Sequence, residues 1–263
     1  MTNNIKRLMP VLFIMDGLIV MSKKFSLHQI IGNVIDQARR LNEWDVDELI
    51  YIDISRTRDK FKSRDDIYVK SFENIKDIIS SISKVSFMPL SFGGGIRSVK
   101  DVEDRIYNGA DKIIINSLLF TNKEIVSNII DRFGSQAVIA SIDYKIHNSN
   151  PIIFNDFGRK QTDFSLIDGV KYLEDLGVGE IFLQNIERDG SAKGYDIENI
   201  KKVCNVVDLP VIACSGGGQY EHFEEVSKIE KLSGIAAGNI FNFKENAYPI
   251  IKKKMKDNQL FVR

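Results

Sequence analysis

The sequence has no excess of either charge and contains few cysteines and histidines. Its 36 lysines and arginines balance 36 aspartates and glutamates over 263 residues, whereas proteins that bind nucleic acid usually carry a basic excess. We therefore expect no nucleic-acid partner. The two cysteines, Cys204 and Cys214, have neither the spacing of metal ligands nor that of a disulfide framework. The three histidines are scattered along the chain, so we expect no metal ion and no other cofactor.

Long apolar runs are also missing. The apolar segment 8–15 contains Pro10, ends before Asp16 and is too short to span a membrane. No small-residue cleavage site follows it, so it does not resemble a secretory signal. We expect a cytoplasmic protein with no membrane partner. No linker or low-complexity stretch divides the chain, which predicts a single domain over residues 1–263.

Short apolar runs recur along the chain, and a stretch with helical periodicity follows each of them. The runs are continuous rather than alternating, which is typical of parallel strands buried on both faces. Eight such units in a chain of this length predict a (β/α)8 TIM barrel; the GxGxxG motif of an open dinucleotide-binding sheet does not follow the first run. The predicted strands are 8–15, 48–53, 86–92, 111–115, 136–142, 180–184, 209–214 and 234–237, and the predicted helices are 29–43, 71–83, 98–108, 121–132, 163–176, 196–205, 220–228 and 244–256.

The second half of the sequence resembles the first. The segment PLSFGGGIRSVKDV (89–102) is similar to PVIACSGGGQYEHF (210–223), and ELIYIDI (48–54) is similar to EIFLQNI (180–186). The two pairs occur in the same order along the chain. We therefore expect a barrel built from two duplicated half-barrels, with strands one to four matched by strands five to eight.

Two glycine-rich turns follow predicted strands three and seven, at equivalent positions of the two halves. Glycines let backbone N–H groups approach an anion closely, although such turns can also serve only to close a tight loop. Their duplicated placement favours a ligand with a phosphate at each end, lying across the barrel mouth. The candidate phosphate-binding residues are Gly93, Gly94, Gly95, Asn116 and Ser117 in the first half, and Asp189, Gly190, Gly216, Gly217, Gly238 and Asn239 in the second.

The motifs FGGGIRS, ADKIIINS, ERDGSAKGYD and IFNF carry a resemblance that extends over nearly the whole chain. The chain resembles the cyclase subunit of imidazole glycerol phosphate synthase, a glutamine amidotransferase of histidine biosynthesis. The resemblance implies a heterodimer in which a glutaminase subunit docks at the bottom face of the barrel. Ammonia then crosses the barrel and attacks a bisphosphorylated aminoimidazole-carboxamide ribonucleotide.

Two aspartates carry the chemistry in that family, one at the end of strand one and one at the end of strand five. The second corresponds to Asp143 in the motif ASIDYK. At the first position the segment PVLFIMDG places Phe13, and Asp16 is accounted for by the Asp-Gly pair that follows in the family pattern. Phenylalanine cannot transfer a proton, and the loss of one general acid or base typically lowers the rate by ~10²–10⁴-fold. We expect weakened cyclase activity.

The bottom of the barrel matches the family more closely. In the family, two basic and two acidic residues close the ammonia entrance, and all four have counterparts in this chain. Their charges would neutralise one another at the barrel axis, where an unpaired charge is costly. The implied ammonia gate consists of Arg7, Glu48, Lys112 and Glu180, and Asp111 corresponds to a residue beside the docked glutaminase.

Three hypotheses follow. A retained gate with a lost carboxylate resembles the diverged second copy found in bacterial surface-saccharide loci, where ammonia is passed to a sugar amidotransferase. The first hypothesis is therefore an ammonia-conducting subunit with weak cyclase activity. The second is a working cyclase that tolerates Phe13. The third is a single-chain aldose–ketose isomerase of the same pathway, which needs no gate because it has no ammonia-supplying partner.

Overall fold

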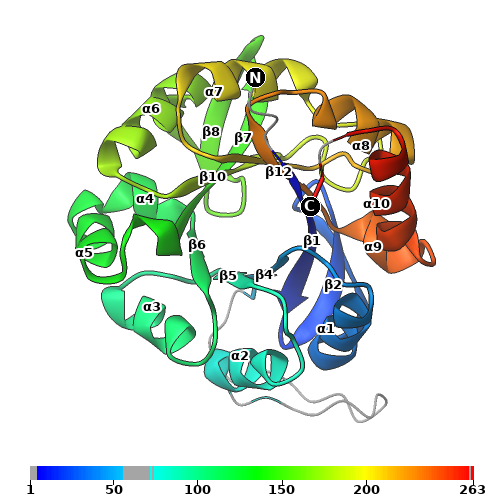
Figure 1. Cartoon of the computed structure of the whole chain (residues 1–263). Coiled ribbons are helices and arrows are strands. Elements are labelled where there is room, and N and C mark those ends of the chain that lie inside the picture. Colours follow the sequence, from blue (N-terminus) through cyan, green and yellow to red (C-terminus); the bar gives the residue numbers. More distant parts are fainter. Residues whose placement is uncertain (1–4, 56–71, 73, 261) are drawn as a thin grey trace.

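Eight parallel strands form a closed barrel in the computed structural model of the chain, which describes residues 5–55, 72, 74–260 and 262–263. The barrel closes because β10 pairs in parallel with both β7 and β11. Figure 1 shows the strands encircling one axis, with helices outside them. The predicted TIM barrel is confirmed. The barrel strands are β1 (Arg7–Met15), β4 (Leu49–Asp53), β5 (Leu90–Gly93), β6 (Lys112–Ile115), β7 (Val138–His147), β10 (Glu180–Asn185), β11 (Val211–Cys214) and β12 (Leu232–Ala237).

The outer helices begin where the sequence supplies a capping side chain. Asn33, Asn74 and Ser98 each accept a hydrogen bond from backbone N–H groups in the first turn of the helix that follows, which satisfies donors that have no partner within the helix. The helices are α1 (Val34–Glu43), α2 (Ile75–Ser83), α3 (Val99–Ile106), α5 (Lys123–Phe133), α6 (Leu166–Leu176), α7 (Ile197–Val206), α8 (Tyr220–Ser227) and α10 (Ala247–Asp257), and a 3₁₀ turn spans Ser135–Ala137. None of the described helices is both long and apolar enough to cross a membrane.

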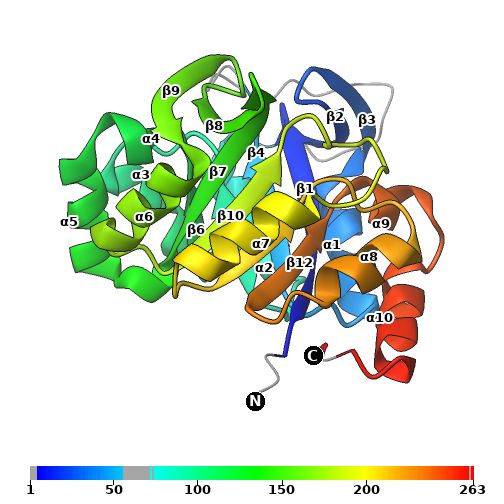
Figure 2. The same ribbon diagram turned by 90° about the horizontal axis from the view of Figure 1, so that it is seen from above.

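Two β-hairpins were not predicted. The first, β2 (Leu18–Lys23) with β3 (Leu27–Asn33), follows β1. The prediction of a helix over 29–43 was therefore wrong for its first five residues. The second hairpin, β8 (Asn150–Asn155) with β9 (Lys160–Ser165), follows β7. In Figure 2 both hairpins lie at the same end of the barrel, opposite the chain termini.

The extra elements occupy equivalent positions in the two halves of the barrel. A hairpin follows the first and the fifth barrel strand, and a short helix follows the fourth and the eighth. These short helices are α4 (Ser117–Thr121) and α9 (Asn239–Phe243). The arrangement is what a duplicated half-barrel predicts. The other predicted boundaries hold to within a few residues, and residues 71 and 73 of the helix predicted over 71–83 lie outside the described residues.

The barrel interior is apolar in its middle and polar at its two ends. A buried cluster fills the middle and is separate from the larger core between strands and helices. Side chains alternate along each strand, so Glu180 and Gln184 lie on the same inward-facing row as Phe182. This apolar cluster, the plug, therefore separates a polar site at the amino ends of the strands from another at their carboxyl ends. The plug includes Met9, Val11, Ile50, Ile114, Ile139, Phe182, Ile212 and Ala236.

Candidate functional site

A cavity of about 640 Å³ opens at the carboxyl ends of the barrel strands. Its apolar lining includes Phe13, Ile52 and Ile114, which belong to the inner cluster or pack against it. Its polar lining includes Asp143 from β7 and Gln184 from β10. Active sites of (β/α)8 barrels lie at this end, so the cavity is the candidate ligand site.

Asp143, the catalytic residue implied by the resemblance, lines this cavity. It is 6% exposed and accepts hydrogen bonds from Asn116 Nδ2 at 3.0 Å and from Gln184 Nε2 at 3.1 Å. Burial raises the pKa of its carboxyl to about 7, although the two amide hydrogen bonds favour the ionised form. A carboxyl group that titrates near neutral pH is suited to proton transfer.

Phe13 lines the same cavity and is 7% exposed. Its ring lies near the residue that follows β12, since ring atom Cε2 is 3.9 Å from the position that a Cβ on Gly238 would take. No carboxylate therefore stands at this position of β1. An aromatic ring fills the place instead.

Asp53 is a cavity residue that the sequence analysis missed. It ends β4, lines the cavity, and accepts hydrogen bonds from the Ser55 backbone N–H at 3.0 Å and hydroxyl at 2.6 Å. Burial raises the pKa of its carboxyl above the usual value. The signal was present, because Ile-Asp ends the apolar run at 52–53 just as it does at 142–143.

The first glycine-rich turn borders this cavity. Gly94, Gly95, Asn116 and Ser117 all line it. Gly94 has φ +97°, and a Cβ there would collide with the carbonyl oxygen of Asp53, so only glycine fits. Gly93 packs against Ile114 instead, which assigns it to the barrel wall. The structure thus brings four of the five predicted residues of this half to one cavity.

The second glycine-rich turn is packed against other parts of the chain. A Cβ on Gly216 would meet the carbonyl of Gly194, and one on Gly217 would lie 2.6 Å from the Tyr195 hydroxyl oxygen. Close packing therefore explains why these positions are glycine. The sequence analysis left this open as the alternative to anion binding. Asn239 Nδ2 donates a hydrogen bond of 2.8 Å to the Ser22 carbonyl in the first hairpin.

Asp189 and Gly190 hold the same hairpin. Asp189 is 6% exposed and accepts hydrogen bonds from the Ser22 hydroxyl at 2.7 Å and the Phe25 N–H at 3.3 Å. Burial raises the pKa of its carboxyl. Gly190 lies so close to the Ser22 carbonyl that a Cβ would clash with it. Both residues bind the hairpin at this end of the barrel.

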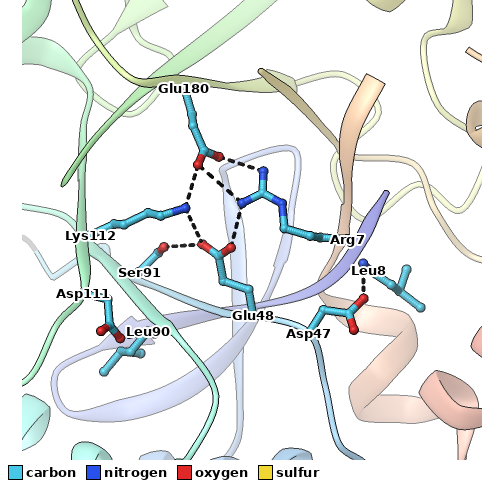
Figure 3. Close-up of polar contacts among 9 residues, drawn as sticks. All are labelled: Arg7, Leu8, Asp47, Glu48, Leu90, Ser91, Asp111, Lys112 and Glu180. Carbon is cyan, nitrogen blue, oxygen red and sulfur yellow. Dashed lines mark hydrogen bonds and ion pairs between the residues drawn. The ribbon is translucent and has the colours of Figure 1, made fainter. Parts of the chain in front are cut away.

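A ring of four charged residues closes the opposite end of the barrel (Figure 3). Arg7 is bonded to Glu48 and to Glu180, each at 2.8 Å, and Lys112 lies 2.6 Å from Glu180 and 3.5 Å from Glu48. Ser91 donates a further hydrogen bond to Glu48 at 2.8 Å. The structure therefore joins all four predicted gate residues in one alternating network.

The ring favours the ionised forms of Arg7 and Glu180. Burial alone would raise the pKa of Glu180, but the hydrogen bonds and charges of Arg7 and Lys112 outweigh it and lower that pKa. Burial alone would lower the pKa of Arg7, but Glu180 and Glu48 raise it. Two positive and two negative charges thus balance at the barrel axis.

Asp111 stands immediately before β6, beside this ring. Its carboxylate accepts a hydrogen bond from the Leu90 N–H at 2.8 Å, just as Asp47 accepts one from the Leu8 N–H at 2.8 Å. Figure 3 shows both aspartates near the ring. In the structure Asp111 therefore holds the start of β5, and its expected place beside a partner subunit remains a prediction.

The cysteines are unsuited to nucleophilic catalysis. Cys204 and Cys214 are both buried and unbridged. Burial raises the pKa of the Cys204 thiol to about 11 and raises that of Cys214 as well, so little reactive thiolate forms at neutral pH. In the part of the chain that the structure describes, no group of three or more His, Cys, Asp or Glu residues is placed to hold a metal ion.

Fold and site together define a (β/α)8 barrel with a cavity of mixed apolar and polar lining at its mouth and a ring of four balanced charges at its base. The profile of a family described as Histidine biosynthesis protein matches residues 7–247. The chain is 33% identical to the imidazole glycerol phosphate synthase subunit HisF of Staphylococcus epidermidis over 260 residues, which cover 98% of this chain and 99% of that protein. It is 34% identical to the protein of the same name from Sulfurisphaera tokodaii over 258 residues, 98% of each chain. The chain belongs to the histidine biosynthesis protein family.

Proposed function

We propose that this chain is the barrel subunit of a glutamine amidotransferase of the imidazole glycerol phosphate synthase type. A glutaminase subunit would dock at the bottom face and release ammonia toward the barrel axis. The observation that carries the proposal is the complete ring of Arg7, Glu48, Lys112 and Glu180, together with Phe13 where the mouth would need a carboxylate.

The ring supports a role beyond stability. Buried ion pairs are often no more stabilising than apolar residues of similar size, because the charges must be taken out of water. A barrel that needed only to be stable could close its base with apolar side chains. Charges that pair in the resting state and can separate would instead control the passage of a small polar molecule.

The presence of Phe13 supports the proposal that cyclase activity at the barrel mouth is weak. Asp143 is held ready for proton transfer, but the opposite position on β1 carries a hydrocarbon ring. The cyclase reaction then proceeds slowly, and the ammonia serves a different acceptor. We propose that the acceptor is a sugar bound to a separate amidotransferase of surface-polysaccharide synthesis, with all three proteins in the cytoplasm.

The second candidate function is a working cyclase in histidine biosynthesis. It is favoured by the full-length similarity to proteins named HisF and by Asp53, a second carboxyl group that lines the same cavity. In this alternative Asp53 replaces the missing aspartate of β1. The isomerase hypothesis gives no role to the charged ring.

An assay with ammonia supplied in solution separates these functions, because it bypasses both the partner and the barrel base. We expect the isolated wild-type chain to convert the bisphosphate ribonucleotide at least ~10²-fold more slowly than an authentic synthase assayed alongside. Phe13→Asp should restore part of the rate. Full recovery is not expected, since a carboxylate placed in an apolar site is costly to ionise.

Variants of the ring supply the control. Arg7→Ala should leave the ammonia-driven reaction unchanged and alter only the glutamine-driven reaction of the complex. Arg7 begins β1, whereas the cavity lies at the carboxyl ends of the strands. A wild-type ammonia-driven rate within about tenfold of the authentic synthase would instead establish the working cyclase. Robust glutamine hydrolysis by the isolated chain would rule out the partner.

A further inference from the structure

We infer that His28, in the β2–β3 hairpin, is a catalytic residue of the barrel mouth and acts as a general base together with Asp143. The inference rests on the proposed function in one respect, that ammonia reaches the mouth and reacts there. It goes further, because it assigns the proton carrier of the slow reaction that remains when β1 carries Phe13 instead of a carboxylate.

The register of the hairpin directs His28 toward the cavity. His28 lies directly across the hairpin from Ser22, and Ile30 lies across from Val20. Side chains paired in this way point to the same face, and so do side chains two residues apart along a strand. Val20 belongs to the apolar cluster inside the barrel and Ile30 packs against it. Ser22 and His28 therefore face the barrel mouth, and both line the cavity.

Asp189, in the segment that follows β10, holds the hairpin in this position. Its carboxylate accepts hydrogen bonds from the Ser22 hydroxyl at 2.7 Å and the Phe25 N–H at 3.3 Å. Its carbonyl accepts a third from the Lys24 N–H at 3.1 Å. These bonds fix the end of β2 that pairs with His28, so they also hold the imidazole at the mouth.

Asp189 also provides a negative charge near His28. Burial raises the pKa of the Asp189 carboxyl, and the positive charge of His28 opposes that rise. The two groups are therefore close enough to interact electrostatically. A carboxylate beside a histidine stabilises the imidazolium that forms when the histidine accepts a proton. Among the described residues, the other titratable side chains that line the cavity are Asp53, Arg97, Asp143, Asp156 and Lys160.

His28 and Asp143 supply opposite proton transfers for the addition of ammonia to a carbonyl carbon of the ligand. The carbon–nitrogen bond forms as the π bond of the carbonyl group breaks. The attacking nitrogen gives one proton to His28, and protonated Asp143, whose pKa is about 7, gives one to the carbonyl oxygen. The product is a neutral carbinolamine. A proton then returns from His28 to Asp143 through water, so both residues recover their starting forms.

The surroundings of the three histidines single out His28 for this role. The structure describes all three, and His28 is the one that lines the cavity. His147 is exposed at the end of β7, and His222 accepts a hydrogen bond from the Gly218 N–H through its Nδ1 atom. Asp53 is the competing candidate for the base, because its carboxyl lines the same cavity.

Chemical rescue of the ammonia-driven reaction with the bisphosphate ribonucleotide tests the inference. His28→Ala should lower the wild-type rate by ~10²-fold, the effect of losing a general base. Imidazole added to the buffer should restore at least about tenfold of that loss, because it can enter the vacated space and accept the proton. A purely structural role of His28 would not respond to imidazole. His147→Ala is the matched control and should leave the rate unchanged, since that side chain is exposed.

The pH profile separates His28 from Asp143. The wild-type rate should fall at acid pH, where the imidazole is protonated, and at alkaline pH, where Asp143 has lost its proton. His28→Ala should abolish the acid limb and keep the alkaline one. Asp189→Asn should move the acid limb to lower pH, because the imidazolium loses a neighbouring negative charge.

Three results would overturn the inference. They are a His28→Ala rate within about threefold of the wild type, a lost rate that imidazole does not restore, and a wild-type chain with no measurable ammonia-driven turnover. A loss of rate in Asp53→Asn with none in His28→Ala would assign the base to Asp53 instead. The proposed function would survive each of these results, because glutamine hydrolysis by the complex tests the partner and does not involve His28.

Discussion

At the scale of single residues, Asp143 couples the pH to the stability of the barrel. Its carboxyl is buried and accepts hydrogen bonds from the amides of Asn116 and Gln184, and its pKa rises to about 7. The folded state therefore holds a proton that the unfolded chain releases near pH 4. The stability that this proton provides is fully present below about pH 4 and is lost as the pH rises toward 7 and above.

Asp143→Asn should remove this pH dependence. The asparagine keeps the shape of the side chain. Gln184 can rotate its amide to present Oε1, which has no partner among the described residues, to the new donor. We expect the variant to be more stable than the wild type by a few kcal/mol at pH 8, roughly 1–4, and by little at pH 4. Urea unfolding at the two pH values measures the difference. Equal stabilities at pH 8 would contradict the raised pKa.

At the scale of elements, the charged ring joins the first residues of separate barrel strands. Arg7 begins β1, Lys112 begins β6 and Glu180 begins β10, while Glu48 immediately precedes β4. Because the four charges sum to zero, the electrostatic stabilisation of each side chain depends on the other three. Removing one leaves a net charge in a partly buried place.

A double-mutant cycle tests this interdependence. Arg7→Met should lower the free energy of unfolding by about 3 kcal/mol, since it leaves two carboxylates facing one lysine. Glu180→Gln should also destabilise the barrel, because it leaves an excess positive charge. The double variant restores neutrality and should lose ~1–2 kcal/mol less than the sum of the single losses. Strict additivity in denaturant unfolding would mean that the ring is not a coupled unit.

At the scale of the whole molecule, the two ends of the barrel differ in structure. The hairpins lie at the carboxyl ends of the barrel strands (Figure 2), and residues of the same end line the cavity. The ring joins residues at the amino ends of the strands (Figure 3). Phe87, in the segment that leads into β5, is 87% exposed at the ring end, and Tyr107, which follows α3, is 71% exposed. Large exposed aromatic residues are typical anchors of protein interfaces.

Phe87→Asp should therefore weaken binding of the proposed glutaminase subunit. A central aromatic anchor contributes about 2 kcal/mol, or roughly thirtyfold in affinity, while an exposed substitution leaves the fold nearly as stable as before. Phe243→Asp is the matched control, because Phe243 is 60% exposed in α9 at the mouth end. Calorimetric titration with the glutaminase measures both variants. Equal affinities would exclude Phe87 as an anchor.

Particular residues explain which parts of the fold the sequence predicted. The continuous run Leu8–Met15 is buried almost throughout its length, so its pattern indicated a barrel strand correctly. The hairpin residues 29–33 were assigned to a helix because this partly exposed strand has few apolar side chains and lacks the continuous apolar run of a barrel strand. Asn33, which caps α1 by accepting from the Ile35 and Asp36 N–H groups, marked the true helix start.

The sequence by itself determined the barrel, its duplication and the signs of the ring charges. These depend on the periodicity of short segments and on residue types at strand ends, which are local properties of the chain. The tertiary structure determined the hydrogen-bond partners and the burial of the side chains at the barrel mouth. Asp143 receives its hydrogen bonds from residues 27 and 41 positions away, and Ser22 meets Asp189 and Asn239 at separations of 167 and 217. No local pattern fixes such pairs, because barrel closure alone brings them within hydrogen-bonding distance and away from water.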